Sequence, residues 1–317
     1  MKPCLKRFNS LDCLRGLAVI LMFAHHFPRW LMFNKAESEV YGYLFIMSRL
    51  SAPLFLFIVG ICLVLSAQRH KNHMLQHYLK RGFLLILIGF LLNLITPMDL
   101  LSFNILHTIG LSIILLFILL IEPIKIKCLL SILLLIPLSH IAYKSIHMKN
   151  ILDMFQFPIL PWIIFVIFGI AAGSFLTDFY RHKMNKFPRY LEFSALLSII
   201  LACALVKLGV SFNYTAYCTG PFIMLSTAAV LYTTAMFFWV YEVYKKNPVF
   251  LKPLIIYGRF AFFIYFIHHV FVYTIPDQLG FLNKFSETGS IISLLWFLII
   301  SWLALSIYTQ VSDKPQH

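Results

Sequence analysis

Long apolar runs separated by short polar connections fill the sequence from end to end. Each run is about 20 residues long, the length that an α-helix needs to cross the hydrocarbon core of a bilayer. Transmembrane β-strands would instead give segments of about ten residues with alternating polarity. The runs predict helices near 11–33, 44–67, 80–97, 102–121, 126–145, 159–179, 190–210, 221–243, 252–275 and 289–311. We therefore expect an all-α integral membrane protein, a polytopic bundle of about ten transmembrane helices.

Composition supports the membrane class. The 317 residues are 61% hydrophobic and 12% charged, with a mean hydropathy of +0.86. A soluble domain needs a far more polar surface than this composition can supply. Because the connections between the runs are short, we expect a single domain over residues 1–317. Its chemistry is expected within the bilayer or at its two faces.

Positive charge is spread between the apolar runs. The net charge is +14, but no basic domain gathers it, so nucleic acid is not expected as a partner. Lys and Arg concentrate in alternate connections, which the positive-inside rule assigns to the cytoplasm together with both termini. The absence of a targeting signal and the compact loops favour a bacterial inner membrane. The basic residues of these connections are Lys2, Lys6, Arg7, Arg69, Lys71, Lys80, Arg81, Lys125, Lys127, Arg181, Lys183, Lys186, Arg189, Lys245, Lys246, Lys252 and Lys314.

Histidines inside the predicted helices share one depth. With the topology above, all of them fall in the outer half of the bilayer. A lone histidine in a helix most simply makes a packing hydrogen bond. Several ionisable groups at one depth instead indicate a site or pathway. The histidines are His25, His26, His107, His140, His268 and His269.

The first predicted helix carries a polar group at each end of one face. Arg15 and His26 share that face and are separated by roughly 16 Å along the axis. Asp12 lies one turn before Arg15, so the two can pair. His25 points about 100° away from His26, and we expect it to pack or to support its neighbour.

Other polar groups keep two interpretations. Asn104, His107, Thr108 and Ser112 form a helical stripe that serves either inter-helix hydrogen bonds or a site. Trp162 is either an aromatic-belt anchor or an acceptor-side residue. Arg49 either reaches the outer headgroups or faces an anionic group in a cavity. The six cysteines have no metal-ligand spacing, so no metal is expected.

Six segments in order resemble the transmembrane acyltransferases. The first is "SLDCLRGLAVILMFAHHF", with an Asp, an Arg-Gly pair, a Met and a following His. It is followed by "SAPLFLFIVGICLVLS", "YLKRGFLLILIGFLL", "ILHTIGLSIILL", "FPILPWIIFVIFGIAAG" and "YGRFAFFIYFIHHVF". The bacterial branch similar to the catalytic domain of heparan-α-glucosaminide N-acetyltransferase is the nearest resemblance, over nearly the whole chain.

The resemblance implies an acyltransferase that uses acetyl-coenzyme A as the donor. It implies transfer from the cytoplasmic side to a sugar, glycan or lipid-linked sugar on the outer side, with a histidine base near the membrane centre. His26 occupies the position of that histidine in bacterial members. The lysosomal enzyme uses a histidine in the following luminal loop, and the loop "PRWLMFNKAESEVYGY" has none here.

A mechanism follows from these placements. His26 is expected to be the general base, since imidazole titrates near neutral pH. We expect His107 and His268 to orient it or the acceptor, and a covalent acetyl-histidine is the variant of this route. Arg49 and Trp162 are the acceptor-side candidates. On the cytoplasmic donor side, Arg15, Lys80, Arg81 and Arg259 are the candidates that bind the phosphates, and Asp12 is expected to organise the entrance together with Arg15.

Two other function classes stay open at this stage. Intramembrane histidines could relay protons in a small-solute transporter, although no inverted repeat is visible. The polar groups could also only pack the helices of an accessory membrane protein. The sequence does not distinguish a monomer from a homo-oligomer.

Overall fold

The computed structural model describes residues 7–69, 73–96, 102–121, 123–145, 156–180, 183–214 and 218–312. The regular structure of these ranges is helical, with an isolated backbone bridge between Met32 and Phe285. The all-α prediction is therefore confirmed. Among the predicted cytoplasmic residues, Lys2, Lys6, Lys71, Arg181 and Lys314 lie outside the described ranges, as does the side chain of His140.

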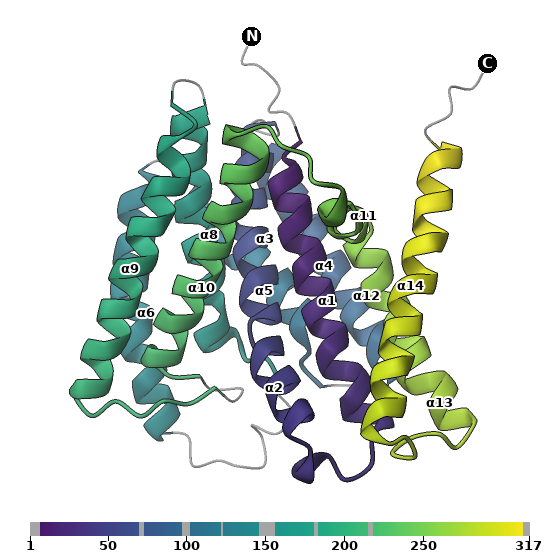
Figure 1. Ribbon diagram of the computed structural model, residues 1–317. Coiled ribbons are helices and arrows are strands. Elements are labelled where there is room, and N and C mark those ends of the chain that lie inside the picture. Colours follow the sequence, from purple (N-terminus) through teal and green to yellow (C-terminus); the bar gives the residue numbers. More distant parts are fainter. Residues whose placement is uncertain are drawn as a thin grey trace. The chain divides into compact units, whose positions relative to one another are not determined.

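Thirteen labelled α-helices carry the fold (Figure 1). They are α1 Asn9–Leu31, α2 Glu39–Ser48, α3 Ser51–Ala67, α4 Met74–Asn93, α5 Ile105–Leu116, α6 Ile124–Ser145, α8 Ile159–Tyr180, α9 Lys186–Lys207, α10 Gly220–Phe238, α11 Lys252–Arg259, α12 Ala261–His269, α13 Ile275–Gln278 and α14 Glu287–Ser312. Two π-helical turns extend α10 and α12, namely η4 Trp239–Val243 and η6 Val270–Thr274. Short 3₁₀ turns are η1 Lys35–Glu37, η3 Phe117–Leu120 and η5 Val249–Leu251.

Seven helical segments of the described chain are long and apolar enough to cross a membrane. They are Asn9–Leu31, Glu39–Ala67, Met74–Asn93, Ile159–Tyr180, Lys186–Lys207, Gly220–Val243 and Glu287–Gln310. An eighth is counted if the pair Val249–Arg259 and Ala261–Gln278 forms one span. The protein is therefore an integral, multi-pass membrane protein.

The predicted helix over 252–275 is broken in the structure. Its two halves bend by 75° at Phe260, which separates α11 from α12. The predicted helix over 102–121 is also shorter, because an apolar segment of Ile105–Leu120 ends in a 3₁₀ turn. In both cases a helix ends inside a segment whose hydropathy predicts one continuous helix. The ends of helices leave backbone groups without intrahelical hydrogen bonds.

The described helices fall into two compact units. The middle unit contains α3 from Ala52 onward, α4, α5, α6, α8, α9 and α10. The terminal unit contains α1, α2, α11, α12, α13 and α14. Each unit has its own closely packed helix pairs.

Paired glycines let helices of the middle unit meet backbone to backbone. A Cβ added to Gly60 would lie 2.1 Å from the carbonyl oxygen of Val166, and one on Gly169 would lie 2.0 Å from that of Phe57. Such small residues are what transmembrane helix interfaces use for close approach. The pair therefore fixes the crossing of α3 and α8.

The same device joins α1 to α11 in the terminal unit. A Cβ on Gly16 would lie 2.0 Å from the carbonyl oxygen of Leu254, and one on Gly258 would lie 1.8 Å from that of Asp12. Neither position can take a side chain unless the helices separate. This crossing also sets where the polar residues of α1 and α11 meet.

Backbone pairing ties the segment after α1 to the segment before α14. Phe33 N–H donates to the carbonyl oxygen of Phe285 at 3.0 Å, and Phe285 N–H donates to that of Leu31 at 2.9 Å. The Lys35 ammonium donates to Asn283 Oδ1 at 2.7 Å. Burial and the nearby Arg29 lower the pKa of Lys35. These bonds stabilise the connection that follows the histidine-bearing end of α1.

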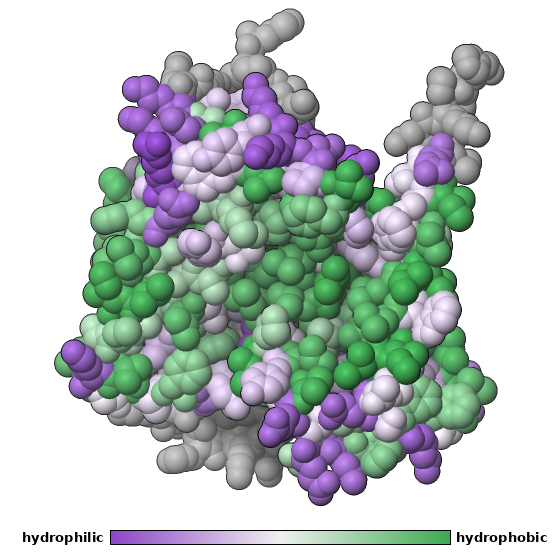
Figure 2. Space-filling view, viewed as in Figure 1, coloured by the Kyte–Doolittle hydropathy of each residue, from purple (hydrophilic) through white to green (hydrophobic). Residues whose placement is uncertain are grey.

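Apolar side chains cover the outward faces of several helices (Figure 2). On α9 they include Phe193 and Ile200, and on α14 they include Trp296 and Ile300. Figure 2 shows hydrophilic residues mainly toward the helix ends. In water such surfaces would aggregate, whereas in a bilayer they face lipid.

We expect the glycine crossing of the terminal unit to be essential for stability. Gly16→Ala forces the backbones of α1 and α11 apart, and overpacking of this kind costs about 1–3 kcal/mol. The apparent Tm in detergent, followed by tryptophan fluorescence, should fall by several degrees. Gly42→Ala is the matched control, because a Cβ there meets nothing within 4 Å. Equal Tm values for the two variants would contradict the proposed crossing.

Candidate active site

Four histidines of the terminal unit form one cluster. His25 and His26 come from α1, and His268 and His269 from the last turn of α12. The ring of His26 lies 5.2 Å from that of His268 and 5.4 Å from that of His269, between centroids. The rings of His268 and His269 are 4.1 Å apart, and those of His25 and His26 are 5.2 Å apart. We call this group the histidine cluster.

The break between α11 and α12 accompanies this arrangement. Arg259 ends α11, and α12 begins at Ala261 after the 75° bend. The π-helical turn η6 follows His269 directly. Such turns occur often at functional sites, because one extra residue redirects the side chains around it. His268 is fully buried at this point and His269 is 7% exposed.

A backbone hydrogen bond assigns the tautomer of His268. Its Nδ1 lies 2.5 Å from the carbonyl oxygen of Tyr265. A carbonyl oxygen can only accept, so neutral His268 carries its proton on Nδ1. Its Nε2 is left with a lone pair, which can accept a proton or a hydrogen bond.

Several nitrogen atoms of the histidine cluster have no partner in the part of the chain described. They are buried, and they are His25 Nδ1, His26 Nδ1, His268 Nε2 and His269 Nε2. Buried polar atoms without a partner are uncommon, because each loses its hydrogen bonds to water. A group of them at one place favours a site that a polar substrate completes.

Aromatic rings enclose the histidine cluster. The ring of Phe23 lies 5.3 Å from that of His268. Tyr265 lies 5.5 Å from His268 and 5.4 Å from His269, again between centroids. Rings of this size exclude water and lower the local dielectric constant, which strengthens electrostatic effects on a reacting group.

His25 contacts Arg29 and Phe45 beside the cluster, and its supporting role stays a prediction. Arg29 Nη1 donates to its Nε2 at 3.3 Å, since a guanidinium cannot accept. Its ring also lies 5.5 Å from that of Phe45, which in turn contacts the guanidinium of Arg49 at 3.9 Å. The half-buried Arg49 is thus linked to the histidine cluster through one aromatic ring.

Polar groups also gather at the N-terminal end of α1. Arg15 Nη1 donates to Asp12 Oδ1 at 2.6 Å, the pairing that the spacing predicts. Asp12 is fully buried, while the Arg15 side chain is 28% exposed. The contact of Gly258 with the Asp12 backbone brings the following residue, the exposed Arg259, to the same end.

One face of α1 therefore joins two polar regions of the terminal unit. Arg15 and His26 stand eleven residues apart on that face, or roughly 16 Å along the helix. Cations lie at one end, beside α11, and the histidine cluster lies at the other, beside α12. This order suits a long substrate with an anionic end and a reactive end.

His107 belongs to the middle unit and caps the helix that carries it. Its Nδ1 lies 3.1 Å from Asn104 N and 3.0 Å from Asn104 Oδ1. The backbone N–H can only donate, so Nδ1 accepts and neutral His107 carries its proton on Nε2. Asn104 Oδ1 accepts from Leu106 N at 2.9 Å, which completes a capping box at the start of α5.

The ring of His107 is also closely packed by its neighbours. A Cβ on Gly89 would lie 2.7 Å from it, and the rings of Phe90 and Phe103 lie 4.4 Å and 5.1 Å away. The structure therefore gives His107 a structural role. Its part in a reaction stays a prediction.

Three further candidates belong to the middle unit. Trp162 is 3% exposed and packs against Phe157 and Phe165, at centroid distances of 4.9 Å and 5.8 Å. It is thus part of the hydrophobic core of that unit. Lys80 and Arg81 lie on α4, and both are exposed.

Sequence reasoning did not assign Tyr265 or Phe45 to the site, and it named His269 only among the histidines that share one depth. Tyr265 precedes His268 and His269 by three and four residues, which is the helical spacing of side chains on one face. That spacing indicates that Tyr265 lies beside the two histidines. The position of Phe45 between His25 and Arg49 depends on the packing of α2 and has no signal in the sequence.

No group of three or more His, Cys, Asp or Glu side chains in the described ranges has the arrangement of a metal site. The histidine cluster has the capacity for acid–base chemistry and hydrogen bonding. Imidazole is suited to that chemistry, since its pKa in water lies close to neutral pH.

Comparison with known proteins identifies one family. The model of the family described as "Heparan-alpha-glucosaminide N-acetyltransferase, catalytic" matches residues 7–205. The match covers α1, with Asp12, Arg15 and His26, and ends in α9. A search of curated proteins found no match.

We expect His107→Gln to preserve the helix cap, because glutamine at this position can accept from the same backbone N–H. His107→Ala should lower the stability by about 0.5–2 kcal/mol, the usual cost of losing a cap. Thermal unfolding of the two variants in detergent measures this difference. A stable His107→Gln protein that has lost its enzymatic activity would show instead that the imidazole takes part in the reaction.

Proposed function

The chain belongs to the heparan-α-glucosaminide N-acetyltransferase catalytic family, and we propose on this premise that it acetylates an extracytoplasmic sugar. It is an acetyl-coenzyme A-dependent acetyltransferase and an integral membrane protein. The acceptor that we propose is a sugar, a glycan or a lipid-linked sugar at the outer face. The observation that carries the proposal is that α1 holds both His26, a member of the buried histidine cluster, and Arg15, which pairs with the buried Asp12.

The proposed topology has ten spans, with both termini in the cytoplasm of a bacterium and residues 1–317 acting as one domain. It rests on the clusters of Lys and Arg in alternate connections. In this orientation the N-terminal end of α1 is cytoplasmic, and the histidine cluster lies in the outer half of the membrane. Donor and acceptor then approach from opposite faces.

The donor side uses cations for the phosphates of coenzyme A. In the terminal unit these are Arg15 and Arg259, which the crossing of α1 and α11 brings to one end. Guanidinium groups bind phosphate oxygens through paired hydrogen bonds. Asp12 holds Arg15 in place through the 2.6 Å bond. Lys80 and Arg81 are further exposed cations for the same purpose.

The thioester end of the donor is expected to reach His26. The pantetheine arm is long and narrow, and the distance of roughly 16 Å between Arg15 and His26 is of the order that it spans. In the site, His26 accepts the proton of the acceptor amine or hydroxyl as that group attacks the thioester carbonyl carbon. A carbon–nitrogen or carbon–oxygen bond forms, the carbon–sulfur bond breaks, and His26 returns the proton to the departing thiolate.

His268 supports this proton transfer as a positioning residue. Its Nδ1–H is held by the Tyr265 carbonyl, so its Nε2 offers a lone pair inside the cluster. A neighbouring acceptor of this kind orients the His26 ring or the acceptor group and favours the transient imidazolium. Arg49, linked to the cluster through Phe45, is the proposed acceptor-side cation.

The family membership favours an enzyme over the transporter and the accessory protein. Intramembrane histidines, which suggested proton relay, fit an acetyltransferase equally well because a base is needed at the acceptor side. Modification of cell-surface glycans is the physiological role we propose. This modification requires only that the acceptor sugar reach the outer half of the membrane.

Replacement of His26 tests the proposed base. His26→Ala should lower the rate of acetyl transfer by about 10²–10⁴-fold, the contribution typical of a general base. The measurement follows radiolabel from acetyl-coenzyme A into lipids and glycans of membranes that contain the protein. His73→Ala is the control, since His73 is exposed at the start of α4. Normal transfer by a folded His26→Ala protein would rule out the assignment.

Replacement of the donor-side arginines tests the phosphate site. Arg15→Gln and Arg259→Gln should each raise the KM for acetyl-coenzyme A about tenfold with little change in kcat, because each removes one charged hydrogen bond. Arg259 is exposed, so its variant is expected to fold even if loss of Arg15 destabilises the buried Asp12. Lys207→Gln, at the C-terminal end of α9 in the middle unit, is the matched charge control. An unchanged KM in the Arg259 variant would remove that residue from the donor site.

A further inference from the structure

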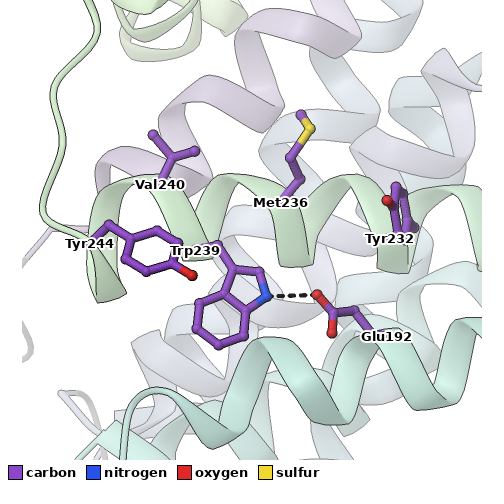
Figure 3. A pocket seen from close by; sticks show the side chains of 6 residues that line it. All are labelled: Glu192, Tyr232, Met236, Trp239, Val240 and Tyr244. Carbon is purple, nitrogen blue, oxygen red and sulfur yellow. Dashed lines mark hydrogen bonds between the residues drawn. The ribbon is translucent and has the colours of Figure 1, made fainter.

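A groove of about 250 Å³ opens between α9 and the end of α10 in the middle unit (Figure 3). Glu192 lines it from α9, and the other lining residues come from α10, η4 and the residue after it. These are Tyr232, Met236, Trp239, Val240 and Tyr244. None of them belongs to the acetyl-transfer site proposed above.

Trp239 makes a hydrogen bond and a ring contact within the groove. Its Nε1–H donates to Glu192 Oε1 at 2.6 Å, the bond drawn in Figure 3. The ring of Tyr244 stacks on it at 5.5 Å with an interplanar angle of 25°. Because Trp239 begins the π-helical turn η4, the helix is redirected at this residue. The bond to Trp239 also uses the only carboxylate among the lining residues.

Three cations lie near the groove, at the start of α9 and just after η4. The guanidinium of Arg189 lies 5.9 Å from the centre of the Trp239 ring. Lys186 is one turn earlier on α9, and Lys245 follows Tyr244 with a φ of 52°. All three side chains are exposed, and within the described ranges no carboxylate lies within 4 Å of their charged nitrogen atoms.

The groove itself is apolar and open to its surroundings. Tyr232 is 64% exposed, Met236 is 47% exposed and Tyr244 is 63% exposed. Tyr232 and Met236 lie on a helix long and apolar enough to cross the membrane, Gly220–Val243, and Tyr244 follows it directly, so this surface meets lipid. An apolar groove next to three exposed cations has the charge and shape that match one anionic amphiphile.

We propose that this groove binds an anionic phospholipid of the surrounding bilayer. The phosphate is held by Arg189, with Lys186 and Lys245 adding to the positive potential, and one acyl chain lies along Tyr232 and Met236. Trp239 fills the boundary between the polar and apolar parts, where indole rings are favoured. With the proposed topology, the site faces the cytoplasmic leaflet. It does not depend on the proposed acetyl transfer.

Quenching of Trp239 fluorescence tests this site directly. The protein is reconstituted in nanodiscs of phosphatidylcholine, and acyl-brominated phosphatidylglycerol or phosphatidylcholine is titrated in. The Trp239 signal is the difference between the unchanged protein and Trp239→Phe. We expect half-maximal quenching at about fivefold less brominated phosphatidylglycerol than brominated phosphatidylcholine, the preference that one cation contributes.

Arg189→Gln should remove most of that preference, and Lys207→Gln at the far end of α9 should keep it. Glu192→Gln retains an acceptor for the indole N–H and should keep it as well. Equal quenching by the two lipids would overturn the proposal. Absence of Trp239 quenching together with a doubled particle mass in mass photometry would show that a second copy of the chain occupies the groove instead.

Discussion

The backbone contact between α1 and α11 is the constraint on which the candidate active site depends. Gly16 and Gly258 leave no room for a side chain, so the two helices cross at van der Waals distance. At that crossing Asp12 is buried and paired with Arg15, and Arg259 follows at the end of α11. The chain then bends by 75° and continues as α12 beside the same α1. Helix α1 therefore meets α11 at the cations and α12 at the histidine cluster.

Burial makes the histidine cluster suitable for acid–base chemistry. Ring nitrogens that have no partner in the described part of the chain lie beside Phe23 and Tyr265, and they are costly in a membrane unless a substrate completes their hydrogen bonds. The Tyr265 carbonyl assigns the proton of His268 to Nδ1 and so creates a lone pair within the site. His107 has the other tautomer, because its Nδ1 accepts from a backbone N–H and its ring stabilises a helix cap, which leaves the proton on a buried Nε2 that has no partner within the described ranges. Histidines of similar predicted depth thus differ through their hydrogen bonds.

Much of this arrangement could be predicted from α1 alone. Its length, the spacing of Asp12 and Arg15, and the shared face of Arg15 and His26 follow from helical geometry. The break at Phe260 could not be predicted, since residues 252–275 have the hydropathy of an unbroken span. The contacts of His268 and His269 with His26, and the link from His25 to Arg49 through Phe45, depend on tertiary packing. For Trp162, sequence reasoning left an aromatic-belt anchor and an acceptor-side residue open, and the structure places the side chain in the hydrophobic core of the middle unit.

The central claim is that His26 and His268 act together in one proton transfer. A double-mutant cycle on purified, reconstituted protein tests it most directly, with acetyl transfer from labelled acetyl-coenzyme A measured for His26→Ala, His268→Ala and the double variant. Residues that act as a unit give strongly non-additive losses. The account predicts that the double variant is no slower than the His26→Ala protein. Losses in rate that multiply between the two single variants, in folded proteins, would contradict it.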